Sequence, residues 1–158
     1  MTLDSFDIRI LAALQAQGDS GPAELAPRVG LSPSQVSRRL AALRKEGLIR
    51  AVHAVLDPQA INIGVSAYVM LTMTSTDPAA AAEFRARIAA MDEVRECQML
   101  TGSPDMILKV ATRDLASLNE LLTRHLLAAS EVATARTSIV LQDVKSTSAL
   151  PLRFVRPG

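Results

Sequence analysis

Polar and basic side chains recur at helical spacing along residues 31–49, LSPSQVSRRLAALRKEGLI. At about 100° per residue, one side of such a helix carries Ser34, Arg38, Ala41 and Lys45. The opposite side carries the apolar residues Val36, Leu40 and Leu43, which are expected to be buried. A short helix with a buried stripe and a basic, small-residue side fits the major groove of double-stranded DNA. The alternative is an ordinary surface helix with solvated arginines.

The residues at both ends of this segment predict where the helix begins and ends. Ser32 is a favourable N-cap, Pro33 suits the first helical position, and Gln35 completes a capping box. Gly47 follows the last turn, where a left-handed backbone conformation is usually needed. Such signals start and end many helices of no special function, so the caps alone do not indicate DNA binding.

Two further helices are predicted upstream of this segment. The first is expected to begin near Asp4 and to end at Gly18. The second is expected to open at Pro22 and to close at Gly30. Pro27 falls inside it and removes one backbone hydrogen bond, so this helix should be short, kinked or partly 3-10. Three short helices within fifty residues, the last two joined by a tight turn, favour a helix-turn-helix over a structural helical bundle.

The charge of the chain is unevenly distributed along the sequence. Residues 1–50 hold seven Lys/Arg and five acidic residues, a net charge of +2. Residues 51–158 hold ten Lys/Arg and eleven acidic residues, a net charge of −1. The positive charge gathers on the third helix, where a phosphate backbone would need it. Because the excess is small, each protomer should bind DNA with moderate affinity, and dimerisation would help.

Composition argues against several other classes of site. The single cysteine, Cys97, is expected to be a small core or interface residue rather than a redox centre. His53 and His125 are far apart in sequence, so we expect no metal site and no cofactor. The chain has no signal peptide and no apolar run long enough to cross a membrane, so we expect a cytoplasmic protein without a membrane partner.

The second half of the chain alternates between strand-like and helix-like patterns. Strands are expected from Val65 to Thr74, Val94 to Leu100, Met106 to Val110 and Val132 to Val144. Helices are expected after Asp77 and after Asp114, near which each helix begins. The order βαββαβ predicts a ferredoxin-like four-stranded sheet with both helices on one face.

Such a sheet has one uncovered face. Tyr68, Met70 and Val110 are expected to lie on it, and apolar side chains there favour cover by a second copy of the chain. We therefore predict a homodimer through this domain. The predicted α+β fold divides into a winged helix-turn-helix domain (1–49), a wing and linker (50–64), a ferredoxin-like oligomerisation domain (65–145) and a C-terminal extension (146–158).

Several short motifs occur in a specific order along nearly the whole chain. They include Leu3-Asp4, Glu24-Leu25-Ala26, Val29-Gly30-Leu31-Ser32-Pro33, Glu46-Gly47, Leu56-Asp57-Pro58, Thr101-Gly102 with Asp105, Thr137-Ser138 and Leu150-Pro151. In this order they resemble the Lrp/AsnC (feast/famine) family of transcription regulators. The resemblance implies an N-terminal winged helix-turn-helix and a C-terminal ligand-sensing domain. It also implies dimers that assemble further, often to octamers, and amino acids or related metabolites as effectors.

By this resemblance residues 32–46 form the recognition helix, and we assign roles within it by position. The candidates for DNA contacts near its start are Ser32, Ser34, Gln35, Ser37 and Arg38. Arg38 could pair with guanine and Gln35 with adenine. The candidate phosphate contacts are Arg44, Lys45 and Arg50. Arg39 points closer to the core edge and is expected to hold a carboxylate or a phosphate.

The family's effector site lies between subunits, around a glycine-containing turn and parts of the final strand. Carried over, it comprises Gly102, Ser103, Pro104 and Asp105, with Thr134, Thr137 and Ser138 as further candidates. Backbone N–H groups and one carboxylate can hold the two charged ends of an amino acid. The family usually has an acidic and an aromatic residue where this chain has Ser103-Pro104. An unusual ligand, weak binding and a hairpin turn without any ligand therefore stay open.

Two competing hypotheses are a small enzyme built on a ferredoxin-like dimer and a stand-alone effector-binding module. Ser103 and His125 with an aspartate could form a catalytic triad on paper, but their spacing does not support one. The sequence shows no nucleophile–base pair, metal-spaced cluster or phosphate loop. The intact first fifty residues argue against the stand-alone module. We therefore predict a regulator without enzymatic activity.

Overall fold

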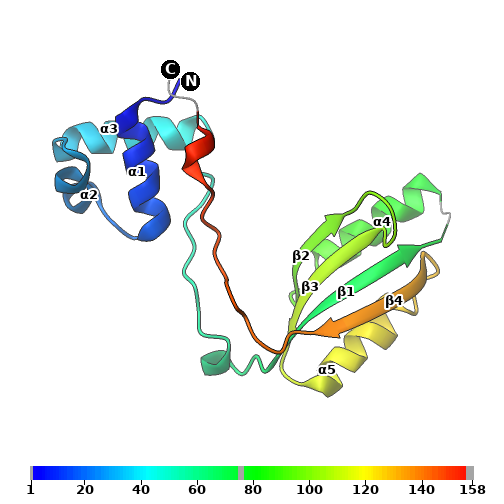
Figure 1. Ribbon diagram of the computed structural model, residues 1–158. Helices are drawn as coiled ribbons and strands as arrows, with labels where there is room; N and C mark the ends of the chain where they lie inside the picture. The colour runs from blue at the N-terminus through cyan, green and yellow to red at the C-terminus, as the bar shows by residue number, and fades with distance from the viewer. Residues whose placement is uncertain (1, 75–76, 156–158) are drawn as a thin grey trace. The chain divides into compact units, whose positions relative to one another are not determined.

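The N-terminal fifty residues fold into three helices, as their caps predict (Figure 1). The computed structural model describes residues 2–74 and 77–155. Its first three helices are α1 (Ser5–Ala16), α2 (Pro22–Val29) and α3 (Pro33–Lys45). The Asp4 side chain accepts hydrogen bonds from the Phe6 and Asp7 N–H groups at the start of α1. Gly30 takes the left-handed conformation (φ 74°) that the tight turn between α2 and α3 requires.

These helices bury one apolar cluster of their own. The predicted stripe of α3, which is Val36, Leu40 and Leu43, packs with Ile10 of α1 and Leu25 of α2. Each of these side chains is buried, and burial of one such side chain stabilises the fold by about 1.5–3 kcal/mol. α2 has only eight residues, so the expectation of a short helix around its internal proline is confirmed.

After α3 the chain continues without forming a regular wing. Gly47 has a φ of 73°, and the Leu48 N–H donates to the Leu43 carbonyl oxygen, which closes the helix end. Residues 51–57 are in neither a helix nor a strand, and a single 3-10 turn follows at Gln59–Ile61 (η1). The segment expected to contain a wing and linker is therefore irregular.

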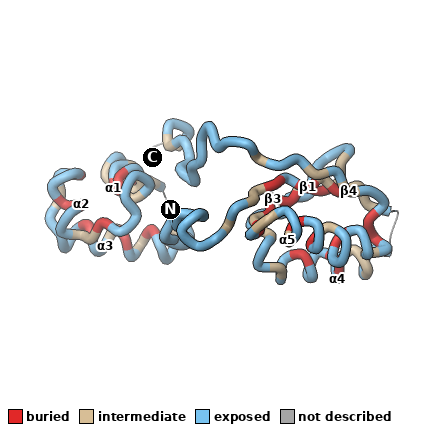
Figure 2. The backbone as a smooth tube through the Cα atoms, turned by 90° about the horizontal axis from the view of Figure 1, so that it is seen from below, coloured by how far each residue is buried: buried red, intermediate tan, exposed pale blue. Residues whose placement is uncertain are grey.

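The second half forms an antiparallel sheet with the strand order β2-β3-β1-β4. The strands are β1 (Val65–Met73), β2 (Val94–Met99), β3 (Met106–Thr112) and β4 (Val132–Ile139). The crossover helices are α4 (Pro78–Ala89) and α5 (Leu115–Glu120), the latter continued by a π-helical turn, η2 (Leu121–Leu126). Both crossovers lie on one side of the strands (Figure 2), which confirms the predicted ferredoxin-like arrangement.

Alternation along β1 separates a buried face from an open face, as predicted. Ala67, Val69 and Leu71 are buried against the helices. Tyr68 is exposed and Met70 is half-buried on the opposite face. The sheet therefore presents one side without helical cover.

The prediction that Val110 lies on the open face is wrong. Val110 is 1% exposed and belongs to the core. It pairs with Ala67 of β1, so it shares the side of the sheet that Ala67 presents to the helices. The open face of β3 instead carries Ile107 and Lys109, which are half-buried.

Two other expectations need correction. β4 ends at Ile139 rather than at Val144, and its last hydrogen bond to β1 joins the Val140 N–H to the Ser66 carbonyl oxygen (2.8 Å). β1 starts at this point, so the following residues have no strand to pair with. Cys97 lies on β2 with an exposed side chain, and it is therefore not a core residue of the chain.

The chain forms two units, each with its own buried core (Figure 2). The helical unit comprises Met1–Val55 together with Lys145–Gly158, and the sheet unit comprises Leu56–Val144. The C-terminal residues predicted to be a separate extension thus belong to the helical unit. Leu150 is fixed there by α1, because the Gln15 side chain donates to its carbonyl oxygen (3.1 Å) and accepts from its N–H (2.6 Å).

Candidate functional site

The outward face of α3 and the residues just after it carry exposed polar and basic side chains: Ser34, Ser37, Arg38, Arg44, Lys45 and Arg50. The apolar stripe on the other side of α3 is buried, so the helix presents only this face to a partner. Within the described residues, none of these four cations takes part in an ion pair. Their donors are therefore available to an anionic partner such as a phosphate backbone.

The start of α3 is closed by a reciprocal cap that uses two of the predicted DNA contacts. The Ser32 hydroxyl oxygen accepts from the Gln35 N–H (3.3 Å), and the Gln35 side-chain oxygen accepts from the Ser32 N–H (2.9 Å). That oxygen also accepts from the Ser32 hydroxyl (3.0 Å). A bidentate pair with adenine needs both the oxygen and the nitrogen of a glutamine side chain. The cap therefore competes with the base contact predicted for Gln35.

Arg39 points to the core edge, and the predicted partner proves to be carboxylate. Its Nη1 lies 2.7 Å from Oδ1 of Asp7 and 2.8 Å from Oδ2 of Asp4. The hydrogen bond that Arg39 donates to Asp7, followed by the one to Asp4, raises the pKa of Arg39. The pKa of Asp4 is lowered, first by the hydrogen bond from the Asp7 N–H and also by Arg39. The pair ties α3 to α1 and leaves Arg39 less free to contact DNA than its neighbours.

The glycine-containing turn of the predicted effector site lies between β2 and β3. Gly102 has a φ of 97°, a conformation that favours glycine. Asp105 is held at the end of the turn, because its N–H donates to the Leu71 carbonyl oxygen (2.9 Å). Its Oδ2 accepts from the Met73 N–H (2.7 Å). One carboxylate oxygen of Asp105 thus binds the last residue of β1. The other oxygen, Oδ1, has no hydrogen-bond partner among the described residues.

The three β4 candidates do not form a single group with this turn. Thr134 pairs with Thr72, near the end of β1 where Asp105 is bound. Ser138 pairs with Tyr68, farther along the same face. Thr137 pairs with Val69, so its side chain lies on the opposite, helix-covered side of the sheet. Within one chain, the predicted effector residues are therefore divided between two faces of the sheet.

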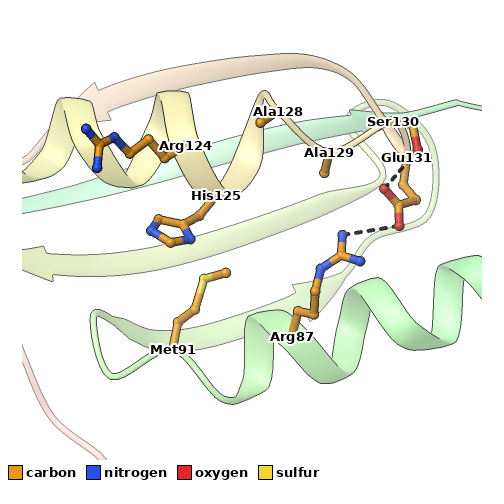
Figure 3. A pocket seen from close by; sticks show the side chains of 8 residues that line it. All are labelled: Arg87, Met91, Arg124, His125, Ala128, Ala129, Ser130 and Glu131. Atoms are coloured by element: carbon orange, nitrogen blue, oxygen red, sulfur yellow. Dashed lines mark hydrogen bonds and ion pairs between the residues drawn. The ribbon is translucent and has the colours of Figure 1, made fainter.

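A cavity of about 450 Å³ lies elsewhere on the sheet unit, between α4 and the segment that leads into β4 (Figure 3). Arg87 points toward Glu131, and its Nη2 lies 3.1 Å from Oε1 of that nearly buried carboxylate. The pKa of Glu131 is lowered, first by the hydrogen bond from its own backbone N–H and then by Arg87. His125 and Met91 also line the cavity. None of the predicted effector residues does, and no local sequence pattern indicated this cavity.

Neither a metal centre nor a catalytic triad is formed by the described part of the chain. Residues 2–74 and 77–155 contain no group of three His, Cys, Asp or Glu residues that could hold a metal ion. Ser103 lies in the turn before β3 and His125 in η2, and no hydrogen bond joins them. In the same ranges, every helix is too short or too polar to span a bilayer.

Comparison with protein families places known domains on both units. Residues 3–50 match the winged helix-turn-helix DNA-binding family, and this range contains α1, α2 and α3. Residues 66–150 match the Lrp/AsnC ligand binding domain, and this range contains nearly the whole sheet with its two crossovers.

Similar proteins match along almost their entire lengths. A leucine-responsive regulatory protein from Haemophilus influenzae is 35% identical over 151 residues, which cover 96% of this chain and 91% of the relative. A proline dehydrogenase transcriptional activator from Rhizobium radiobacter is 35% identical over 145 residues, covering 92% and 93%. The crystal structure of a transcriptional regulator from Neisseria meningitidis in complex with L-Met has a TM-score of 0.92 and 36% identity, covering 96% of this chain and 97% of that chain.

Proposed function

The chain belongs to the Lrp/AsnC family of transcription regulators, and we propose that it reads specific DNA sequences with α3 and responds to an amino acid or a related metabolite. The observation that carries the DNA-reading role is the division of α3 into a buried apolar side and an exposed face with unpaired cations. A helix of this kind can enter the major groove without exposing its core.

Within α3, Arg38 is the best candidate for reading a base. It is exposed on the outward face and can donate two hydrogen bonds to the O6 and N7 atoms of guanine. Ser34 and Ser37 flank it and can contact either base edges or phosphates. Arg44, Lys45 and Arg50 hold phosphates, which position the helix without specifying sequence. Gln35 serves first as a cap and Arg39 first as the partner of α1.

A second copy of the chain supplies the cover that the sheet unit lacks. The open face carries Tyr68, Met70 and Ile107, which no helix covers. Apolar surface continues in the residues just after β4, where Leu141 is 98% exposed. Apolar surface of this kind favours association, and a two-fold dimer would present two copies of α3 to half-sites about one helical turn apart. The family resemblance extends this assembly to octamers.

The effector site is assigned to the turn Gly102–Asp105 and to β4 residues contributed across a subunit interface. The free Oδ1 of Asp105 can accept a hydrogen bond from an ammonium group, and Thr134 lies at the same end of the sheet. The division of the candidates between two faces supports a site completed by another subunit. The relative bound to L-Met supports an amino acid as the ligand class. Such a ligand alters DNA affinity only if it prefers one assembly or one domain arrangement.

DNA binding is tested with the full-length protein and fluorescent duplexes from the region upstream of its own gene. We expect salt-sensitive binding that is at least about a thousandfold tighter than binding to a random duplex of equal length. Equal affinity for both duplexes would contradict sequence-specific recognition. A thermal-shift screen against the twenty amino acids tests the effector, because a ligand that prefers the folded protein raises Tm in a concentration-dependent way.

A further inference from the structure

The C-terminal segment is a second basic part of the helical unit, after α3. Residues 145–158 contain three Lys/Arg, which are Lys145, Arg153 and Arg156, and no acidic residue. They raise the net formal charge of the helical unit from +2 for residues 1–55 to +5. The sheet unit, with seven Lys/Arg and eleven acidic residues, has a net charge of −4. More than half of the positive excess of the helical unit thus comes from outside the helix-turn-helix.

This segment is docked on the helical unit rather than only tethered to it. Gln15 of α1 makes two hydrogen bonds with the backbone of Leu150, one in each direction, as two paired strands would. A short 3-10 helix, η3 (Leu152–Phe154), follows directly and lies in the same unit (Figure 1). A free tail loses conformational entropy when it binds a partner. Because this segment is already docked, its cations would bind at a smaller entropic cost.

The two described cations of the segment are free for such a partner. The side chains of Lys145 and Arg153 are exposed, and neither forms an ion pair with the described residues. Arg153 stacks on the ring of its neighbour Phe154, with its guanidinium carbon 4.8 Å from the ring centre. An arginine stacked on a ring keeps its N–H groups available at the ring edge.

We propose that the C-terminal segment is a second DNA-contacting element of the helical unit, in which Lys145 and Arg153 hold backbone phosphates. The inference rests on the proposed DNA-binding function and adds a surface to it. The segment belongs to the same unit as α3, so its cations are carried to a bound duplex together with that helix.

The test measures how affinity for a random duplex depends on salt, because the slope of log K against log salt counts neutralised phosphates. The double variant Lys145→Gln, Arg153→Gln should lower the magnitude of this slope by about 2, which corresponds to roughly 60-fold weaker binding at 0.1 M salt. The ratio of specific to random affinity should stay unchanged, because phosphate contacts carry no sequence information.

A matched control removes two exposed cations from the sheet unit. The double variant Arg85→Gln, Arg95→Gln changes the net charge of the chain by the same amount; both side chains are exposed, and neither forms an ion pair with the described residues. It should keep the wild-type slope. Gln15→Ala provides an independent test of docking. It should lower the slope as the tail variant does, and adding Lys145→Gln and Arg153→Gln to Gln15→Ala should then have little further effect.

The outcomes separate this inference from the proposed function. If the wild-type protein shows no salt-sensitive binding to any duplex, DNA binding itself is refuted. If the wild type binds and the tail variant keeps the wild-type slope, with an unchanged Tm and oligomeric state, only the second contact is refuted. An equal loss of slope in the sheet-unit control would also overturn it, because net charge alone would then explain the effect.

Discussion

The Nη1 atom of Arg39 in α3 lies 2.7 Å from Oδ1 of Asp7 in α1, and this contact fixes α3 to α1. The Asp7 side chain is only 3% exposed, whereas that of Arg39 is 26% exposed. The charge of Asp7 is therefore shielded from water and relies on Arg39 for its stabilisation, whereas the charge of Arg39 is still partly hydrated. A buried carboxylate that loses its cation keeps its desolvation cost.

We predict that Arg39→Ala lowers the free energy of unfolding by about 2 kcal/mol, because Asp7 is left buried without its charged partner. Urea denaturation followed by circular dichroism measures this loss. Arg28→Ala, which removes an exposed arginine from α2, should change stability by about 0.5 kcal/mol or less. Equal effects of the two substitutions would show that the ion pair does not support the helical unit.

Arg38 and Lys45 should differ in what they contribute to DNA binding. Arg38→Ala should weaken binding to the specific duplex by about 1–3 kcal/mol and reduce the difference between specific and random duplexes. Lys45→Ala should weaken binding to both duplexes alike and lower the salt slope by about 1. Fluorescence anisotropy with both duplexes makes the comparison. Equal losses on both duplexes for Arg38→Ala would refute its base-reading role.

Gly64 marks a close backbone approach just before β1. Its N–H donates to the Arg113 carbonyl oxygen (3.1 Å), and a Cβ at this position would lie 2.7 Å from that oxygen. Because the neighbouring atom is backbone, Gly64→Ala should force a shift and lower the unfolding free energy by about 2 kcal/mol. Gly21→Ala is the control, since a Cβ at Gly21 meets no atom within 4 Å. A smaller loss for Gly64→Ala than for this control would contradict the close approach.

The cap of α5 should give the protein a specific sensitivity to acid. The pKa of Asp114 is lowered to about 2, first by the hydrogen bond from the Ser117 N–H, then by the Ser117 hydroxyl and by Arg113. The ordinary value is 3.8, so the unfolded chain binds this proton first as pH falls. The stabilisation is therefore complete above about pH 5 and is lost as pH falls toward about 2.

Carboxyl NMR titration of the folded protein checks this directly. We expect a midpoint near 2 for Asp114. Asp114→Ala should remove the part of the acid dependence of stability that arises from this group. The variant has no carboxylate to accept the hydrogen bonds from Ser117 at any pH. A midpoint at the ordinary value would show that the cap does not favour the charged form.

Local chemistry made the helices predictable, because caps and turns are short-range features. Ser32 and Gly30 lie where hydrogen bonding and backbone conformation require their residue types. β1 was also predictable from local sequence, because its residues alternate between the two faces of the sheet. β3 is apolar except for Lys109 and Thr112, and Lys109, next to Val110, was the available signal that Val110 faces the core.

The features that escaped prediction depend on partners distant in sequence. The end of β4 is set by where β1 begins, not by the apolar residues that continue beyond Ile139. The docking of Leu150 on Gln15 joins residues 135 positions apart through an ordinary glutamine. The cavity beside Arg87 likewise needs the packing of α4 against the segment before β4. For Arg39 the position at the core edge was predicted, and the structure shows carboxylate partners there.

The helical unit is discontinuous in sequence, since its last piece follows the sheet unit. During synthesis the residues that dock on α1 therefore emerge from the ribosome only after the sheet unit has emerged. A nascent chain holds an unfinished DNA-binding unit until that moment. An insertion in a sheet-unit turn would leave the helical unit undisturbed.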